Sequence, residues 1–221
     1  MADVYIIVEG HGEQGFLDEC VIPHLWSRGV YGRAILEGGV RAWPTVRREI
    51  TDFLKEGKRG RPIYVSTMFD YFRLPMDWPG RRDAASKPIP ERAIHVERQI
   101  ALEVAAHLGD AFRPELLFPY IQMHELEALV LAEPLNLSAE FPGQDKAIGD
   151  LADSIAGMLP EEINDDPINA PSKRIIRFLP EYERRKAQAA VNVLSITGLA
   201  VLRDRCPHFN QWISQLEALG A

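Results

Sequence analysis

The chain has 221 residues, of which 46% are hydrophobic and 26% are charged, and its formal net charge is −7. This mixture is that of a globular protein and excludes a disordered chain, and no apolar run approaches the roughly 20 residues that a membrane helix needs. An acidic chain also lacks the general basic surface with which a protein holds nucleic acid by its own charge, so contact with nucleic acid would need a local basic strip or a partner. An apolar strand follows the first residues directly, without the features of a signal peptide, so we expect a cytoplasmic protein with no membrane partner.

The first part of the chain alternates between strand and helix patterns. Apolar runs predict buried strands, and apolar residues at helical spacing predict helices between them. In chain order, the pattern predicts a strand over 4–8, a helix over 13–26, a weak strand over 33–36, a helix over 43–54 and a strand over 63–69.

The middle of the chain adds a loop, a helix and a fourth strand. Residues 74–90 are rich in Pro, Gly, Arg and Asp and predict a long loop, which indicates function or disorder. Residues 93–108 predict a helix. Residues 116–123 predict the fourth strand, with Pro119 at its start or at a bend.

Strand–helix alternation predicts βαβ units and therefore an α/β fold, with a mostly parallel four-stranded sheet flanked by helices. We assign this core to residues 1–131. Residues 132–221 predict a helical extension packed on the core, interrupted by a loop around 165–171.

Carboxylates follow several of the predicted strands. Glu9 and then Glu13 come after the first strand, Asp70 ends the third, and Glu125 and Glu127 come after the fourth. Ligands bind at the carboxyl ends of parallel strands, and neighbouring strands lie only about 5 Å apart, so these side chains are expected to converge. Converging carboxylates repel each other unless a cation neutralises them, which predicts a hard divalent metal site for Mg²⁺ or Mn²⁺. Such an ion can activate a nucleophile at a phosphodiester. The alternative is that each acidic residue only favours the start of the next helix.

The two glutamates after the fourth strand differ in their expected direction. Two residues apart on a helix, Glu125 and Glu127 diverge by about 200°, so one of them should face the site, and we prefer Glu125 because it is nearer the strand end. His124, beside them, could orient a phosphate or simply cap the junction between strand and helix.

Three blocks of sequence carry a family resemblance. Residues 8–13, 68–75 and 122–129 resemble, in order, the signature blocks of domain-of-unknown-function family 4276, and residues 206–212 resemble its C-terminal end. The resemblance spans nearly the whole chain. It implies a TOPRIM-like domain, distantly similar to the nuclease half of the OLD nucleases, which often occurs beside an ATPase in bacterial defence neighbourhoods.

The resemblance also implies roles for individual residues. Glu9 corresponds to the TOPRIM glutamate, a general acid/base or metal ligand, with Glu13 as a second ligand, and Asp70 corresponds to the first aspartate and primary metal ligand. Phe72 stands where the TOPRIM pattern has its second aspartate. Glu125 or Glu127 would then replace the missing oxygen, giving a predicted catalytic set of Glu9, Asp70 and Glu125. The departure equally leaves open an inactive domain.

Basic residues offer candidate phosphate contacts. Arg73 lies in the loop beside Asp70, where a phosphate backbone could run, and a solvated loop is the alternative. Lys173 and Arg174 follow a serine at a predicted helix start, a position that favours anions, and Lys186 lies further along. Together with His124 these residues form the predicted phosphate-binding set, although an ordinary polar helix face is the alternative for Lys186.

Three functions are therefore weighed. The first is a Mg²⁺- or Mn²⁺-dependent nuclease acting on DNA or RNA with a separate ATPase, and the second is an inactive TOPRIM-like subunit that binds nucleic acid or nucleotide and regulates that partner. The third is a nucleotide-binding oxidoreductase, because residues 10–15 match G-x-G-x-x-G, but the flanking Glu9 and Glu13 would repel a pyrophosphate. A homo-oligomer is left open.

Overall fold

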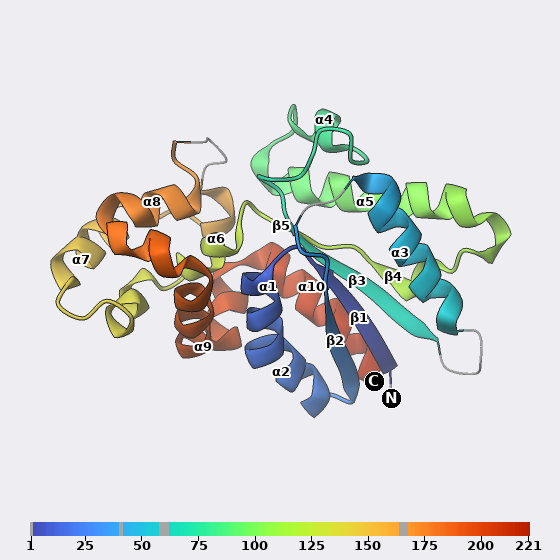
Figure 1. The fold of residues 1–221 in the computed structure, drawn as a ribbon, viewed down its shortest axis with the longest axis horizontal. Helices are drawn as coiled ribbons and strands as arrows, with labels where there is room; N and C mark the ends of the chain where they lie inside the picture. Colours follow the sequence, from blue (N-terminus) through green and yellow to red (C-terminus); the bar gives the residue numbers. More distant parts are fainter. Residues whose placement is uncertain (1, 40–41, 58–61, 164–167) are drawn as a thin grey trace.

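A computed structural model of the chain describes residues 2–39, 42–57, 62–163 and 168–221. Its centre is a parallel sheet with helices on both faces, which confirms the predicted fold class (Figure 1). The strand order is β2-β1-β3-β4, with β5 paired to β3, and every described pairing is parallel. The strands are β1 (Ala2–Val8), β2 (Val30–Leu36), β3 (Ile63–Asp70), β4 (Leu117–Phe118) and β5 (Ile121–Gln122).

The central strand β1 is buried on both faces. Val4, Ile6 and Val8 belong to one hydrophobic cluster, while Ile7, on the opposite face, belongs to another. This arrangement explains why the strand reads as a continuous apolar run.

The helices before the middle of the chain divide between the two faces. The predicted helix over 13–26 is continuous but changes pitch, as α1 (His11–Phe16), a π-helical segment η1 (Leu17–Val21) and α2 (Ile22–Ser27). On the other face lie α3 (Trp43–Glu56) and α5 (Ile89–Leu108).

The predicted fourth strand is split into β4 and β5 at Pro119, so the sheet has five strands rather than four. Proline has no N–H to donate to a sheet ladder. At the break, the Thr67 hydroxyl takes the place of the missing backbone hydrogen bonds. It accepts a hydrogen bond from the backbone N–H of Tyr120 and donates one to the Tyr120 carbonyl, each at 2.9 Å. The bend predicted from Pro119 is thus confirmed.

The long loop over 74–90 is packed rather than extended into solvent. Leu74 and Trp78 are buried, and the Trp78 ring lies 5.1 Å from that of Phe69 in β3. The loop also contains one short helix, α4 (Arg81–Ala84).

The remainder of the chain is helical, as predicted. Of the predicted loop around 165–171, residues 165–167 lie outside the described residues, and Pro171 already begins a helix. The elements are η3 (Gly109–Ala111), η4 (Pro114–Leu116), α6 (Leu126–Val130), η5 (Pro134–Ala139), α7 (Asp145–Ser154), η6 (Pro160–Glu162), α8 (Pro171–Phe178), η7 (Pro180–Arg185), α9 (Lys186–Arg205, with non-helical angles at Gly198), α10 (Pro207–Glu217) and η8 (Ala218–Gly220).

The C-terminal helices share a core with the sheet. One hydrophobic cluster contains Val8 of β1 together with Leu194 of α9 and Phe209 of α10. The C-terminal helices are therefore packed on the same face of the sheet as α1 and α2. None of the described helices is long and apolar enough to cross a membrane.

Candidate metal and phosphate site

Four carboxylates meet at the carboxyl ends of the strands. Glu9 directly follows β1, Asp70 ends β3, Glu13 lies in the first turn of α1 and Glu127 in that of α6, and all four line one cavity of about 200 Å³. Each is less than one-tenth exposed. Strand register brings them together, because Val8 pairs with Met68 and Asp70 with Gln122. The predicted convergence of acidic residues from separate strand ends is therefore present in the structure.

Burial and mutual repulsion hold protons on these groups. Burial, followed by the charge of Glu13, raises the pKa of Glu9 from 4.5 to about 7. Burial also raises the pKa of Asp70 well above its usual range, with further contributions from the surrounding glutamates, and raises that of Glu13. The pKa of Glu127 rises to about 7, again mainly through burial. Ionisation of the whole cluster is thus unfavourable, and a bound cation would reduce the repulsion between its carboxylates.

Two oxygen atoms of the cluster are buried and accept no hydrogen bond among the described residues: Oε2 of Glu9 and Oδ1 of Asp70. Buried polar atoms nearly always have partners, so these two oxygens are the atoms of the cluster that remain available to a ligand.

Two cations border the carboxylates. Lys186 Nζ lies 3.3 Å from Oε1 of Glu127 and 4.0 Å from Oε1 of Glu125. Burial lowers the pKa of Lys186, but these two glutamates outweigh it, so the net pKa is raised and the lysine stays charged. Arg73 Nη1 lies 3.7 Å from Oε1 of Glu9, and its side chain is 60% exposed. Both cations line the cavity, so one is held inside it and the other lies at its mouth.

Glu125 and Glu127 do point in different directions, but Glu127 is the one that lines the cavity. Glu125 is the N-cap residue of α6, and its Oε2 accepts the backbone N–H of Ser172 at 2.9 Å. The preference for Glu125 as the residue facing the site is corrected on this geometry, because tertiary contact with α8 turns its carboxylate away.

The start of α8 is used differently from the prediction. Ala170, not Ser172, is the N-cap residue. The Ser172 N–H, which could donate to a phosphate, already donates to the carboxylate of Glu125. Lys173 is exposed, and Arg174 Nε donates to the Asn169 carbonyl at 3.1 Å. Neither residue lines the cavity, so a phosphate contact at this helix would lie outside it.

His124 is fully buried and lies outside the cavity lining. Its ring stands edge-on to that of Tyr71, with the centroids 6.4 Å apart, and the Met123–His124 peptide bond is cis. The Phe72 N–H donates to the His124 carbonyl at 2.9 Å, so His124 joins the segment after β5 to the segment after β3.

The donor set can be tested against a divalent metal. Mg²⁺ and Mn²⁺ prefer carboxylate oxygens, and the cluster supplies these together with the unpartnered oxygens of Glu9 and Asp70. Over the described ranges, no group of three or more His, Cys, Asp or Glu side chains is already arranged to hold a metal ion. The residues therefore fit a hard cation in chemistry and charge, and binding it would require the carboxylates to draw closer together.

Comparison with known proteins gives a family. The sequence profile of the family described as Domain of unknown function (DUF4276) matches residues 8–217. The chain belongs to this family. The match confirms the resemblance drawn from the three sequence blocks.

Two solved structures are similar to this DUF4276 chain. Both are of the C-terminal region of the Xanthomonas campestris pv. campestris OLD protein, one phased with iodine and one with mercury, and both are 19% identical in sequence. The first comparison covers 98% of this chain and 95% of the other at a TM-score of 0.40, and the second covers 96% of each at 0.35. No curated protein matches the chain.

In this DUF4276 chain the glycines over 10–15 serve packing. A Cβ on Gly12 would lie 3.2 Å from Cδ2 of Leu126, and one on Gly15 would lie 3.0 Å from Cγ2 of Val191. The glycines thus let α1 approach α6 and α9 closely, which accounts for their spacing without a dinucleotide. Together with the flanking carboxylates, this packing disfavours the oxidoreductase hypothesis.

Sequence reasoning named Lys186 among the candidate phosphate contacts but did not predict the carboxylates that it contacts. Its ion pairs with Glu125 and Glu127 join residues about 60 positions apart in the chain. Tyr182 Oη donates to Oε1 of Glu127 at 3.3 Å, a contact that fixes the same carboxylate. No local pattern signals such pairs, because they depend on how η7 and α9 pack against α6.

Proposed function

We propose that this protein is a divalent-metal-dependent nuclease that hydrolyses phosphodiester bonds at the cavity lined by Glu9, Glu13, Asp70 and Glu127. The observation that carries the proposal is the gathering of these buried carboxylates, with unpartnered oxygens, at the carboxyl ends of parallel strands beside a cationic Lys186. The family resemblance, which implies a TOPRIM-like nuclease domain, agrees with it.

Glu9, Asp70 and Glu127 would hold Mg²⁺ or Mn²⁺, with Glu13 and the more remote Glu125 supporting them. A bound ion of this kind orients and activates a water molecule and stabilises the leaving oxygen of a phosphodiester. The carboxylates would lose their protons as the ion enters, because its positive charge stabilises the ionised forms that burial and mutual repulsion disfavour.

The cations around the cavity would act on the substrate. Arg73 is exposed at the mouth and can attract a phosphate of the backbone, while Lys186 is held in the lining by Glu127 and can pair with a phosphate nearer the carboxylates.

A separately encoded ATPase would supply substrate recognition. The net charge of −7 supports this part of the proposal, because the chain as a whole repels a polyanion and has few cations at the site.

The test is cleavage of single- and double-stranded DNA and RNA by the purified chain with Mn²⁺, alone and with the ATPase encoded beside it. Asp70→Asn and Glu9→Gln should abolish cleavage while leaving the fold intact, and Glu56→Gln, which changes an exposed glutamate of α3, should not. Cleavage that persists unchanged in the Asp70→Asn protein would refute the assignment.

An inactive TOPRIM-like subunit is the second candidate. The observation that favours it is Phe72 in the place of the second TOPRIM aspartate, together with the ion pairs that already occupy Glu9 and Glu127. This candidate predicts nucleic-acid binding that survives both Asp70→Asn and removal of metal, and no Mn²⁺ binding by calorimetry.

A further inference from the structure

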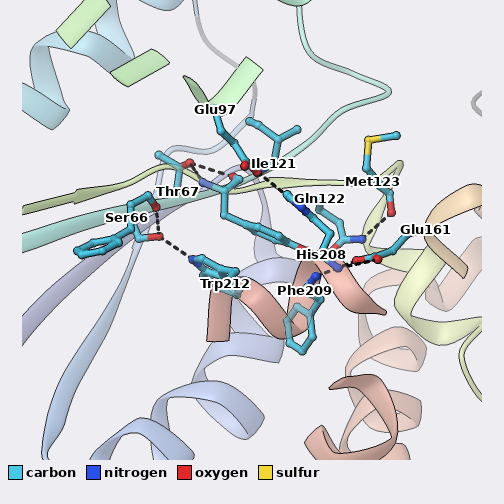
Figure 2. A network of polar contacts seen from close by, with 12 residues as sticks. Ser66, Thr67, Glu97, Ile121, Gln122, Met123, Glu161, His208, Phe209 and Trp212 are labelled. Atoms are coloured by element: carbon cyan, nitrogen blue, oxygen red, sulfur yellow. Dashed lines mark hydrogen bonds and ion pairs between the residues drawn. The ribbon is translucent and has the colours of Figure 1, made fainter. Parts of the chain in front are cut away.

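The residues 206–212 that carry part of the family resemblance lie away from the carboxylate cavity. They form the start of α10, with Cys206 as N-cap residue and Pro207 in the first turn. The backbone N–H groups of His208 and Phe209 donate to the carboxylate of Glu161, at 2.9 and 2.8 Å (Figure 2). Glu161 thereby occupies the positive end of α10 and fixes how the helix presents His208.

Aromatic side chains of α10 pack against the break in the predicted fourth strand, between β4 and β5. Tyr120, between β4 and β5, is stacked between the rings of His208 and Trp212, with centroid distances of 5.0 and 4.4 Å. Trp212 Nε1 donates to the Ser66 hydroxyl at 2.8 Å, and that hydroxyl donates to the Phe118 carbonyl at 2.6 Å. The break is therefore fixed on the α10 side of the sheet.

The other side of the break is held by α5. Oε1 of Glu97 accepts the backbone N–H of Ile121 at 2.8 Å and lies 2.8 Å from Nε2 of His208. Glu97 and His208 come from helices on opposite faces of the sheet and meet around its edge beyond β4 (Figure 2). Burial raises the pKa of Glu97 to about 8 and lowers that of His208 to about 4, so at neutral pH the pair keeps its contact without net charge.

The segment that Glu97 holds leads directly into the carboxylate site. Ile121 pairs with Phe69, the residue before Asp70, and the Tyr71 N–H donates to the Gln122 carbonyl at 3.0 Å. Three residues beyond Gln122 the chain reaches Glu125, and α6 with Glu127 follows. The position of Glu127 relative to Asp70 therefore depends on where the strand break is fixed.

We propose that Glu97 and His208 are positioning residues: Glu97 holds the backbone N–H of Ile121, His208 holds Glu97 from the other face of the sheet, and together they set Glu127 against Asp70 in the carboxylate site. The inference rests on the proposed function only in that it assigns these residues to the same site. Neither residue lines the carboxylate cavity, so the pair acts through the backbone of β5.

The experiment compares Glu97→Leu with Glu97→Gln by amide hydrogen exchange and by Mn²⁺ calorimetry. Leucine removes the oxygen that contacts both the Ile121 N–H and Nε2 of His208, whereas the amide oxygen of glutamine can accept from both, with His208 donating from Nε2. We expect Glu97→Leu to speed exchange over residues 120–127 by about tenfold or more and to weaken Mn²⁺ binding by a similar factor. Glu97→Gln should return both to within about threefold of wild type, because the amide oxygen restores the acceptor that leucine lacks.

Val104→Ala is the matched control. Val104 is fully buried in the same helix, and its side chain cannot form a hydrogen bond to the strand break. It should lower overall stability without selectively speeding exchange over residues 120–127. Wild-type exchange there in Glu97→Leu would overturn the inference, as would equal acceleration by Val104→Ala. If wild type itself binds no Mn²⁺, the proposed function fails, and the exchange measurements still decide the positioning role.

Discussion

The crowding of buried carboxylates predicts that removing one charge stabilises the protein. Glu9→Gln replaces a carboxylate by an amide of nearly the same shape. In the wild type, burial and the neighbouring Glu13 raise the pKa of Glu9 from 4.5 to about 7, and Arg73 offsets only part of this effect. The folded state therefore holds the Glu9 proton more tightly than the unfolded state does.

The size and pH dependence of the effect follow from these two pKa values. Below pH 4.5 Glu9 is protonated in both states and costs nothing, the cost grows as the pH rises from 4.5, and it levels off above about 7. At roughly 1.4 kcal/mol for each tenfold change in proton affinity, the full cost is about 3 kcal/mol. Glu9→Gln should thus match the wild type at about pH 4 and exceed its free energy of unfolding by about 3 kcal/mol at about pH 8.

Urea denaturation at the two pH values measures this difference directly. Glu56→Gln serves as control, since Glu56 is exposed and its substitution should change little at either pH. Adding Mn²⁺ at the higher pH should stabilise the wild type more than Glu9→Gln and so narrow or reverse the difference. Equal unfolding free energies of the two proteins at both pH values would refute the claim that repulsion and burial raise the cost of ionising Glu9.

Other substitutions test the contacts around the site. In urea denaturation, Lys186→Met should lower the free energy of unfolding by about 2 kcal/mol, because it leaves Glu127 without its ion-pair partner. Adding Glu127→Gln to the same chain should recover most of the loss, and an unchanged free energy of unfolding in the single variant would contradict this. Glu161→Ala should cost about 1 to 2 kcal/mol by thermal denaturation, since two N–H groups at the start of α10 lose their acceptor. Gly15→Ala should cost about 1 kcal/mol net through its clash with Val191, and Val191→Ala should relieve it, whereas a stabilised Gly15→Ala would show that α1 and α9 have room to adjust.

Much of the fold followed from local pattern. The apolar run over 4–8 and the helical spacing over 93–108 each correspond to an element in the structure, although most elements begin a few residues earlier than predicted. The split at Pro119 was anticipated only as a bend, because the sequence does not show that Thr67 would take over the missing ladder contacts.

The candidate site was predictable in part for a topological reason. Parallel strands deliver whatever follows them to one edge of the sheet, so Glu9 and Asp70 could be placed together from chain order alone. The helix start before Lys173 and Arg174 indicates an anion without indicating which one, and the structure places the carboxylate of Glu125 on the Ser172 N–H there.

The sequence by itself determined the order of strands and helices, the parallel sheet and the acidic edge, because these depend on the two- and 3.6-residue periods and on what comes next in the chain. Only the tertiary structure decided that Glu127 rather than Glu125 lines the cavity, that Lys186 pairs with both, and that Glu97 meets His208 around the sheet edge. Those outcomes depend on packing between helices that are about 50 to 110 residues apart in the chain, and the direction of a buried carboxylate is set by whichever donor that packing brings within hydrogen-bonding reach.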